Sequence, residues 1–246
     1  MTLRKTLIIT GGGVTSVTLP EDWNNNDNIV ACLGAGGNGG DGSFDGAGGG
    51  AYSQETNLVL PIGYEIPCHA GHHDGDGNKD SWINGTTLAT SSVGAKGGGN
   101  AAQPSGTNGG QASAGVGTLK YSGGNGGLSN SGTGGGGGGA AGPNGNGNNG
   151  VLEVGGSGDA GFGGAAGEDG AEFNDGFQGC GGGGNGGGAN RTGYYGAGGG
   201  SGLNSSPGSH GTNGILIFIY TPIIFNHLTE YERSKIPGPV SGPIPY

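Results

Sequence analysis

The stretch at positions 72–80, HHDGDGNKD, gathers residue types that commonly bind metal ions. Four oxygen-bearing side chains alternate with other residues along it, at Asp74, Asp76, Asn78 and Asp80. This is the spacing of the first ligands in a calcium-binding loop. Such a loop also needs a glutamate at its twelfth position and helices on both sides, whereas Gly85 stands at that position. A calcium site is therefore the less favoured interpretation.

Histidines add a second kind of ligand to the same part of the sequence. They are His69, His72 and His73. Imidazole nitrogens are common zinc ligands, but the residues around these histidines are those of turns. The sequence therefore predicts no metal ion and no cofactor.

Motifs for catalysis are weak. Because the chain holds 70 glycines among 246 residues, G-x-G-x-x-G spacings arise by chance, and none precedes a predicted helix. Lys96 stands in GAKGGG, without the spacing of a phosphate-binding loop. No base is paired with a nucleophile in a recognisable context. We therefore predict that the protein is not an enzyme.

Large side chains suited to recognition interrupt the glycine tracts. Aromatic residues and arginine offer a large contact area at low entropic cost. The predicted loops are 69–85, 158–179 and 189–195, and the predicted receptor-binding residues are Trp82, Phe162, Phe173, Phe177, Arg191, Tyr194 and Tyr195. The alternative is that these aromatic residues form a small core at the ends of the glycine segments.

Short β-strands are predicted on both sides of the glycine tracts. The apolar and β-branched runs that indicate them lie at 6–10, 14–20, 28–34, 55–71 as two strands around a Pro-Ile-Gly turn, 86–92 and 214–220. Only 225–235 has a pattern that could form a short helix. We therefore expect little or no α-helix.

The glycine tracts, 34–50 and 94–214, show a period of three. Non-glycine residues recur at Ala35, Asn38, Asp41, Phe44 and Ala47. Three residues per turn is the repeat of the polyproline-II helix, which polyglycine also adopts. Such rods pack closely only where their facing positions are glycine, so the six glycines at 134–139 predict a central rod. A flexible linker is the alternative, because glycine-rich tracts usually stay disordered.

We therefore predict a mostly irregular and β fold, with short strands at the ends of a layered bundle of polyglycine-II helices. The glycine-rich domain is expected to span 1–221, with β segments at 5–34, 55–92 and 214–221 around the rods. Residues 222–246 are proline-rich and should form an extended docking tail. Its predicted assembly contacts are Phe225, Tyr231, Ile236, Val240, Ile244 and Tyr246.

The order of these segments resembles the glycine-rich domain of bacteriophage virion and tail proteins. The resemblance rests on VTSVTLP, NIVACLGAGGNGG, GGGAYSQETNLVLPIGYEIPCHAG and GTNGILIFIYTP, and it covers most of 5–221. The chain is similar to the distal tail-fibre adhesins of T-even-type phages. In those proteins a polyglycine-II sandwich carries loops that bind the host surface. An N-terminal fibre-attachment domain is not evident, which leaves the position on the particle open.

The resemblance implies a virion protein that binds the host cell surface, a protein or a glycan, through loops between glycine rods. It also implies contacts with other virion proteins of the fibre, tail or capsid, and it leaves the oligomeric state open. One alternative is a structural or decorating component of head or tail without a receptor role. A minor alternative is an ice-binding protein, since polyglycine-II bundles also occur in that class.

Charge and cysteine content bear on partners and compartment. With only eight Lys and Arg and a net charge of −10, the chain should bind neither nucleic acid nor an anionic membrane. Its longest apolar run, 215–225, is too short to span a bilayer, and no signal peptide is predicted. Cys32, Cys68 and Cys180 are interpreted as free thiols. We expect a virion protein assembled in the host cytoplasm.

Overall fold

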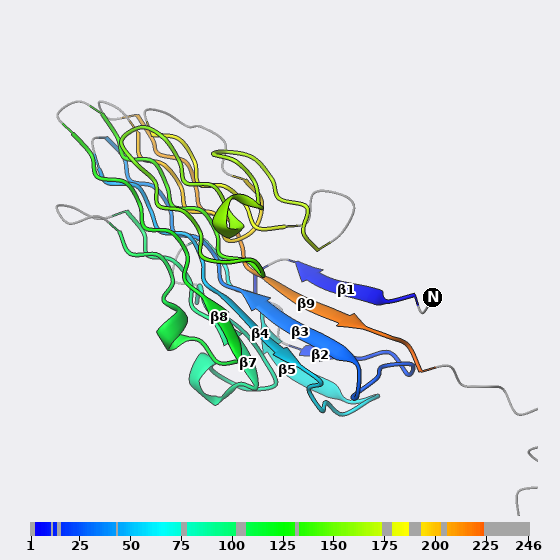
Figure 1. Ribbon diagram of the computed structural model, residues 1–246. Coiled ribbons are helices and arrows are strands. Elements are labelled where there is room, and N and C mark those ends of the chain that lie inside the picture. The colour runs from blue at the N-terminus through cyan, green and yellow to red at the C-terminus, as the bar shows by residue number, and fades with distance from the viewer. Residues whose placement is uncertain are drawn as a thin grey trace, which may run out of the picture.

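The computed structural model shows two regions, a pair of β-sheets and a set of extended glycine-rich segments (Figure 1). The glycine segments project from one end of the sheets, while the N-terminus and the chain leaving the last strand lie at the opposite end (Figure 1). The structure describes residues 3–10, 12–13, 16–42, 44–74, 78–101, 107–130, 133–173, 179–186, 193–202 and 206–223.

The larger sheet has five strands, all paired antiparallel. Their order is β1 (Lys5–Thr10), β9 (Ile215–Tyr220), β3 (Asn28–Leu33), β4 (Tyr52–Thr56) and β8 (Leu119–Tyr121). The central strand β9 has the sequence ILIFIY, and this continuous apolar run is typical of a strand that is buried on both faces.

The smaller sheet packs against one face of the larger one. Its strands, also antiparallel, follow the order β2 (Ser16–Thr18), β5 (Glu65–His69), β6 (Ser81–Ile83) and β7 (Val93–Ala95). The core between the sheets includes Leu216 and Phe218 of β9 and Ile66 of β5. Trp23 is completely buried there, with its ring edge-on to Phe218 at a centroid distance of 6.0 Å.

The glycine-rich region packs on part of the other face of the larger sheet. Ile215 and Ile217, which alternate with Leu216 and Phe218 along β9, belong to a second core. There they join Ala140 and Ala141, which follow a run of six glycines, and Phe173. The larger sheet thus contacts the small sheet on one face and part of the glycine-rich region on the other.

The run Gly134–Gly139, the central glycine run, is buried and bonded to six other segments. The N–H groups of residues 135–141 donate at 2.8–3.0 Å to three segments in turn, 44–50, 148–151 and 181–184. The carbonyl groups of the run accept in turn from three others, 124–127, 153–156 and 198–201. Because each neighbour recurs at every third residue, the backbone satisfies itself without regular strands.

Close approach explains why this run contains only glycine. A Cβ atom on any of its six residues would overlap a backbone carbonyl oxygen of a neighbour, such as that of Gly198 for Gly137 or that of Gly124 for Gly138. Backbone atoms held by their own hydrogen bonds cannot move aside as a flexible side chain can. Any side chain would therefore separate the segments.

Asparagines complete the hydrogen bonding at outer positions of this region. The side-chain oxygens of Asn146 and Asn149, three residues apart, accept from the backbone N–H groups of Ser122 and Asn125 at 2.8 Å each. The side-chain oxygen of Asn125 in turn accepts from the N–H of Gly109 at 2.9 Å. An amide oxygen thus replaces a neighbouring backbone carbonyl, which gives the three-residue spacing of asparagine a structural cause.

The prediction of a mostly β and irregular chain is confirmed, since no α-helix occurs among the residues described here. Three short 3₁₀ helices occur instead, η1 (Leu88–Thr90), η2 (Ala112–Ala114) and η3 (Asp159–Gly161). In the same residues, no helix is long and apolar enough to cross a membrane.

Three sequence expectations about the elements are wrong. The first of the two strands predicted in 55–71 is β4, which ends at Thr56, so Leu58 and Leu60 lie in no strand. The segment 86–92 was expected to be a strand but contains η1, because Thr90 Oγ1 accepts from the Thr87 backbone N–H and competes with strand pairing. The tract 94–214 was expected to be glycine rod but includes β8. The strands β6, β7 and β8 were not predicted, because three residues are too few to show an alternating pattern.

Candidate recognition surface

Exposed apolar side chains gather where the glycine-rich region lies farthest from the sheets. Ala140 and Ala141 pack in the second core, so Gly134 marks the distal end of the central run. Around that end lie Phe44, Leu128, Val151, Leu152 and Val154, which we call the distal apolar group; all are exposed, from 39% for Phe44 to 61% for Leu128.

Backbone hydrogen bonds place these residues close together. Gly135 donates to the Phe44 carbonyl at 3.0 Å, and Gly136 donates to the Val151 carbonyl at 2.9 Å. Gly136 also accepts from Gly127, the residue before Leu128, at 2.7 Å. The segments that carry the group are thus fixed to the same few glycines.

A tight turn presents the aliphatic members of the group. Val151 donates to the Val154 carbonyl at 2.8 Å, and Val154 donates back at 3.3 Å. Between them, Glu153 adopts a φ of 60°, which is uncommon for a residue with a side chain. The sequence VLEV therefore folds back on itself and leaves its valines and Leu152 exposed.

The predicted aromatic recognition residues lie elsewhere, and two of them are buried. Trp82 lies in β6 rather than in a loop, is 8% exposed and stacks on His69 at a centroid distance of 4.4 Å. Phe173 is 7% exposed and stacks on Tyr52 at 6.2 Å. The predicted surface position is wrong for both, because each ring packs on the sheets; for Phe173, the small-core alternative holds.

Phe162, Tyr194 and Tyr195 are nearer to the sheets than the distal apolar group is. Phe162 and Tyr194 are exposed, while Tyr195 packs partly against the second core. Phe162 lies three residues after Asp159, and the Asp159 N–H donates to the carbonyl of Ala140 at the sheet end of the central glycine run. Phe177 and Arg191 lie outside the described residues, as do all six predicted contacts of the C-terminal tail.

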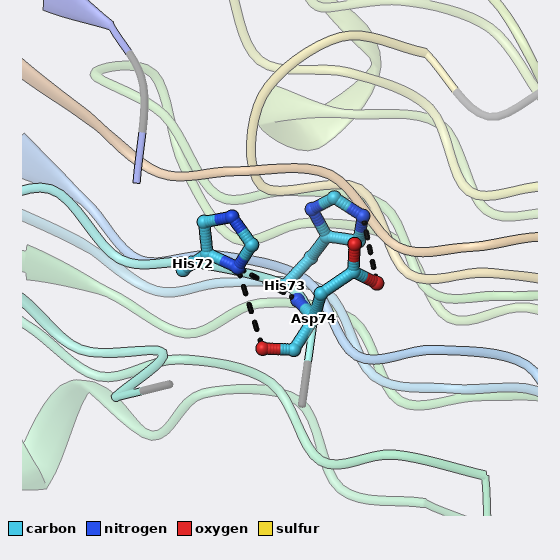
Figure 2. A group of neighbouring side chains, drawn as sticks. All are labelled: His72, His73 and Asp74. Atoms are coloured by element: carbon cyan, nitrogen blue, oxygen red, sulfur yellow. Dashed lines mark hydrogen bonds and ion pairs between the residues drawn. The ribbon is translucent and has the colours of Figure 1, made fainter. Parts of the chain in front are cut away.

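Tyr194 and Tyr195 line a shallow cavity of about 330 Å³ together with Thr10, His73, Thr212 and Asn213. Its histidine belongs to a group in which ligand atoms of His72, His73 and Asp74 all lie within 4.8 Å of one another. In Figure 2 the His73 ring points to the Asp74 carboxylate, and His72 contacts the Asp74 backbone. These residues could hold a metal ion.

Other residues of the stretch 72–80 have separate roles. The Asp80 carboxylate is mostly buried and accepts from Lys96 Nζ at 3.0 Å and from the Gly97 N–H at 2.9 Å. The His69 ring stacks on Trp82, so it belongs to the small sheet. Asp76 lies outside the described residues.

The three cysteines are buried and unpaired, which confirms the prediction of free thiols. Burial raises the pKa of Cys68 to about 11 and holds the pKa values of Cys32 and Cys180 well above the ordinary value. Because the thiolate is the reactive form, these thiols are structural rather than nucleophilic.

Comparison with known proteins adds no family to these observations. No protein-family model matches the chain, and a search of curated proteins gives no match. The resemblance to phage glycine-rich domains therefore rests on the order and type of the segments quoted above.

Proposed function

We propose that the glycine segments form a bundle of polyglycine-II helices. The support is the order of hydrogen bonds along the central glycine run. Successive N–H groups donate to different segments, successive carbonyl groups accept from others, and the same segment is bonded again after three residues. A helix with three residues per turn has this symmetry, whereas an α-helix or a strand has not.

We further propose that the chain is a non-enzymatic phage virion protein that binds the host cell surface. The observation that carries this proposal is that the two ends of the molecule differ. The distal apolar group is exposed at one end. The N-terminus and the end of β9 lie at the other (Figure 1). Loops held by a rigid frame are common recognition sites, and exposed apolar patches commonly mark interaction surfaces.

The opposite end would face the particle. β9 ends there, and the predicted docking tail 222–246 follows it, so contacts with fibre, tail or capsid proteins are expected on that side. This assignment replaces Trp82 and Phe173 by the distal apolar group as the main receptor contacts. Phe162 and Tyr194 remain exposed residues for lateral contacts.

The test is binding of the purified full chain to bacterial cells and competition with phage adsorption. Leu128→Ser and Val154→Ser remove exposed apolar groups at the distal end. Val59→Ser is the matched control, since Val59 is 74% exposed and its neighbours Leu58 and Leu60 bond to Asn28 and Asn25, near the end of β9.

We expect the wild type and Val59→Ser to bind cells and to block adsorption equally. The distal variants should bind about tenfold more weakly or worse, the loss that about 1.4 kcal/mol produces. Binding that is unchanged in the distal variants would contradict the proposed surface. A wild type that neither binds nor competes would favour a decorating protein without a receptor role.

A further inference from the structure

Five side chains from two distant parts of the sequence meet where the glycine region joins the sheets. His72, His73 and Asp74 follow β5. His210 and Asn213 precede β9, and Asn213 is 140 residues from His73. His210 Nδ1 lies 3.5 Å from Asp74 Oδ1, and the rings of His73 and His210 meet edge-on at 6.0 Å.

Asn213 fixes the tautomer of the His73 ring. The Asn213 Oδ1 atom accepts from the His73 backbone N–H at 3.1 Å, which identifies it as the amide oxygen. The same oxygen lies 2.7 Å from His73 Nδ1, so that nitrogen must carry a proton. In a neutral ring, Nε2 is then left with its lone pair.

That lone pair faces another acceptor. His73 Nε2 lies 3.1 Å from Asp74 Oδ1, and His210 Nδ1 approaches the same oxygen. Two acceptors at this distance repel one another unless a proton or a cation lies between them. The arrangement is therefore suited to a positive ion.

The distances fit a transition metal. Zinc bonds imidazole nitrogen and carboxylate oxygen at about 2.0–2.1 Å in a tetrahedron, which places ligand atoms about 3.4 Å apart. Asp74 Oδ1 lies 3.1 Å from His73 Nε2 and 3.5 Å from His210 Nδ1, one distance just below and one just above that separation. His72, whose ring stacks on His73 at 5.3 Å, supplies a further nitrogen within the 4.8 Å group (Figure 2).

We propose that His72, His73 and Asp74, whose ligand atoms all lie within 4.8 Å of one another, bind one divalent transition-metal ion of the zinc class, with His210 beside the Asp74 carboxylate as a further ligand. Imidazole favours zinc, copper or nickel, whereas calcium and magnesium require mostly oxygen ligands. Asn213 is the positioning residue, because an outer hydrogen bond to the second ring nitrogen orients a metal-bound histidine.

The bound ion would connect the segment after β5 to the segment before β9. A ligand that binds only the folded chain stabilises it, so zinc should raise the unfolding temperature. The proposal is independent of host binding, because its residues lie at the junction with the sheets and the distal apolar group does not contribute.

The test is titration of the chelator-treated full chain with Zn²⁺ by calorimetry and with Co²⁺ by visible absorption. The variants are His73→Ala, Asp74→Asn, His210→Ala and Asn213→Ala. The control is His69→Gln, which removes a histidine that packs on Trp82 outside the group.

We expect one ion per wild-type chain, a Co²⁺ spectrum of mixed nitrogen and oxygen ligation, and no competition from Ca²⁺. His73→Ala and Asp74→Asn should weaken binding at least tenfold, and Asn213→Ala about 10–100-fold, while His69→Gln should bind as the wild type does. Asp74→Asn should fold as the wild type does, because the two side chains have nearly the same shape and the Asp74 side chain is about half exposed. Absence of saturable binding in the wild type, or equal binding by His73→Ala and Asp74→Asn, would overturn the proposal.

Discussion

The two-sheet region and the glycine-rich region are held together by opposite means. Between the sheets, large side chains such as Trp23, Leu216 and Phe218 are completely buried and pack on one another. In the glycine region, the central run is equally buried, but backbone hydrogen bonds to six segments replace side-chain packing. Cohesion thus depends on the size of the side chains in one region and on their absence in the other.

The largest effect is expected from removing a side chain in the sheet region. Phe218→Ala leaves a cavity beside Trp23, and such a loss in a close-packed core costs about 3–5 kcal/mol. Denaturant unfolding measures the change, and Phe218→Leu, which retains most of the volume, should cost clearly less.

Adding a single methyl group to the glycine region should be almost as damaging. Gly137→Ala would drive a Cβ atom into the Gly198 carbonyl oxygen, and we expect a loss of about 3 kcal/mol or more, the upper end for an overpacked core. The matched control is Gly63→Ala, in an open turn where the new Cβ atom would meet no other atom within 4 Å. Only the φ of 78° disfavours alanine there, at an expected cost of about 1–2 kcal/mol. Equal costs at the two positions would contradict close backbone packing.

A smaller effect is expected at the edge of the glycine region. Asn125→Ala removes the oxygen that accepts from the Gly109 N–H, and one such hydrogen bond is worth about 0.5–1.5 kcal/mol. Asn26→Ala, at an exposed asparagine in the sheet region, should change the free energy of unfolding by less than the uncertainty of the measurement.

The smallest effect concerns pH. Burial raises the pKa of Glu172 above its ordinary value of 4.5, and among the described residues one of its carboxylate oxygens has no hydrogen-bond partner. A raised pKa means that the folded state favours the protonated form, so this contribution to stability is lost as the pH rises above 4.5 through the raised value. Glu172→Gln should therefore raise the unfolding temperature at pH 7 more than at pH 4. An equal change at both pH values would contradict this origin.

Sequence patterns predicted the long strands, but they did not predict which glycine segments lie side by side or which exposed apolar residues gather. β3 and β9 were predictable because their apolar, β-branched runs exceed four residues. The order of neighbours around Gly134–Gly139 was not, because a glycine carries no side chain that distinguishes one partner from another. The distal apolar group was missed because its members are isolated in sequence.

The group around His72 and His73 was also not predictable from local sequence patterns. His72 and His73 are adjacent in the sequence, but His210 and Asn213 meet them only through the pairing of β9 with β3 and the path of the segments that precede these strands. The turn residues around His72 and His73 therefore argued against a metal site, because the sequence does not show that His210 and Asn213 lie beside these histidines.

Amide hydrogen exchange of the native chain tests backbone packing most directly. The N–H groups of Gly135 to Gly139 all donate within the buried glycine region, so they should exchange as slowly as those of β9, through global unfolding. Exchange of these glycines at the rate of an unstructured peptide, while β9 remains protected, would contradict the account.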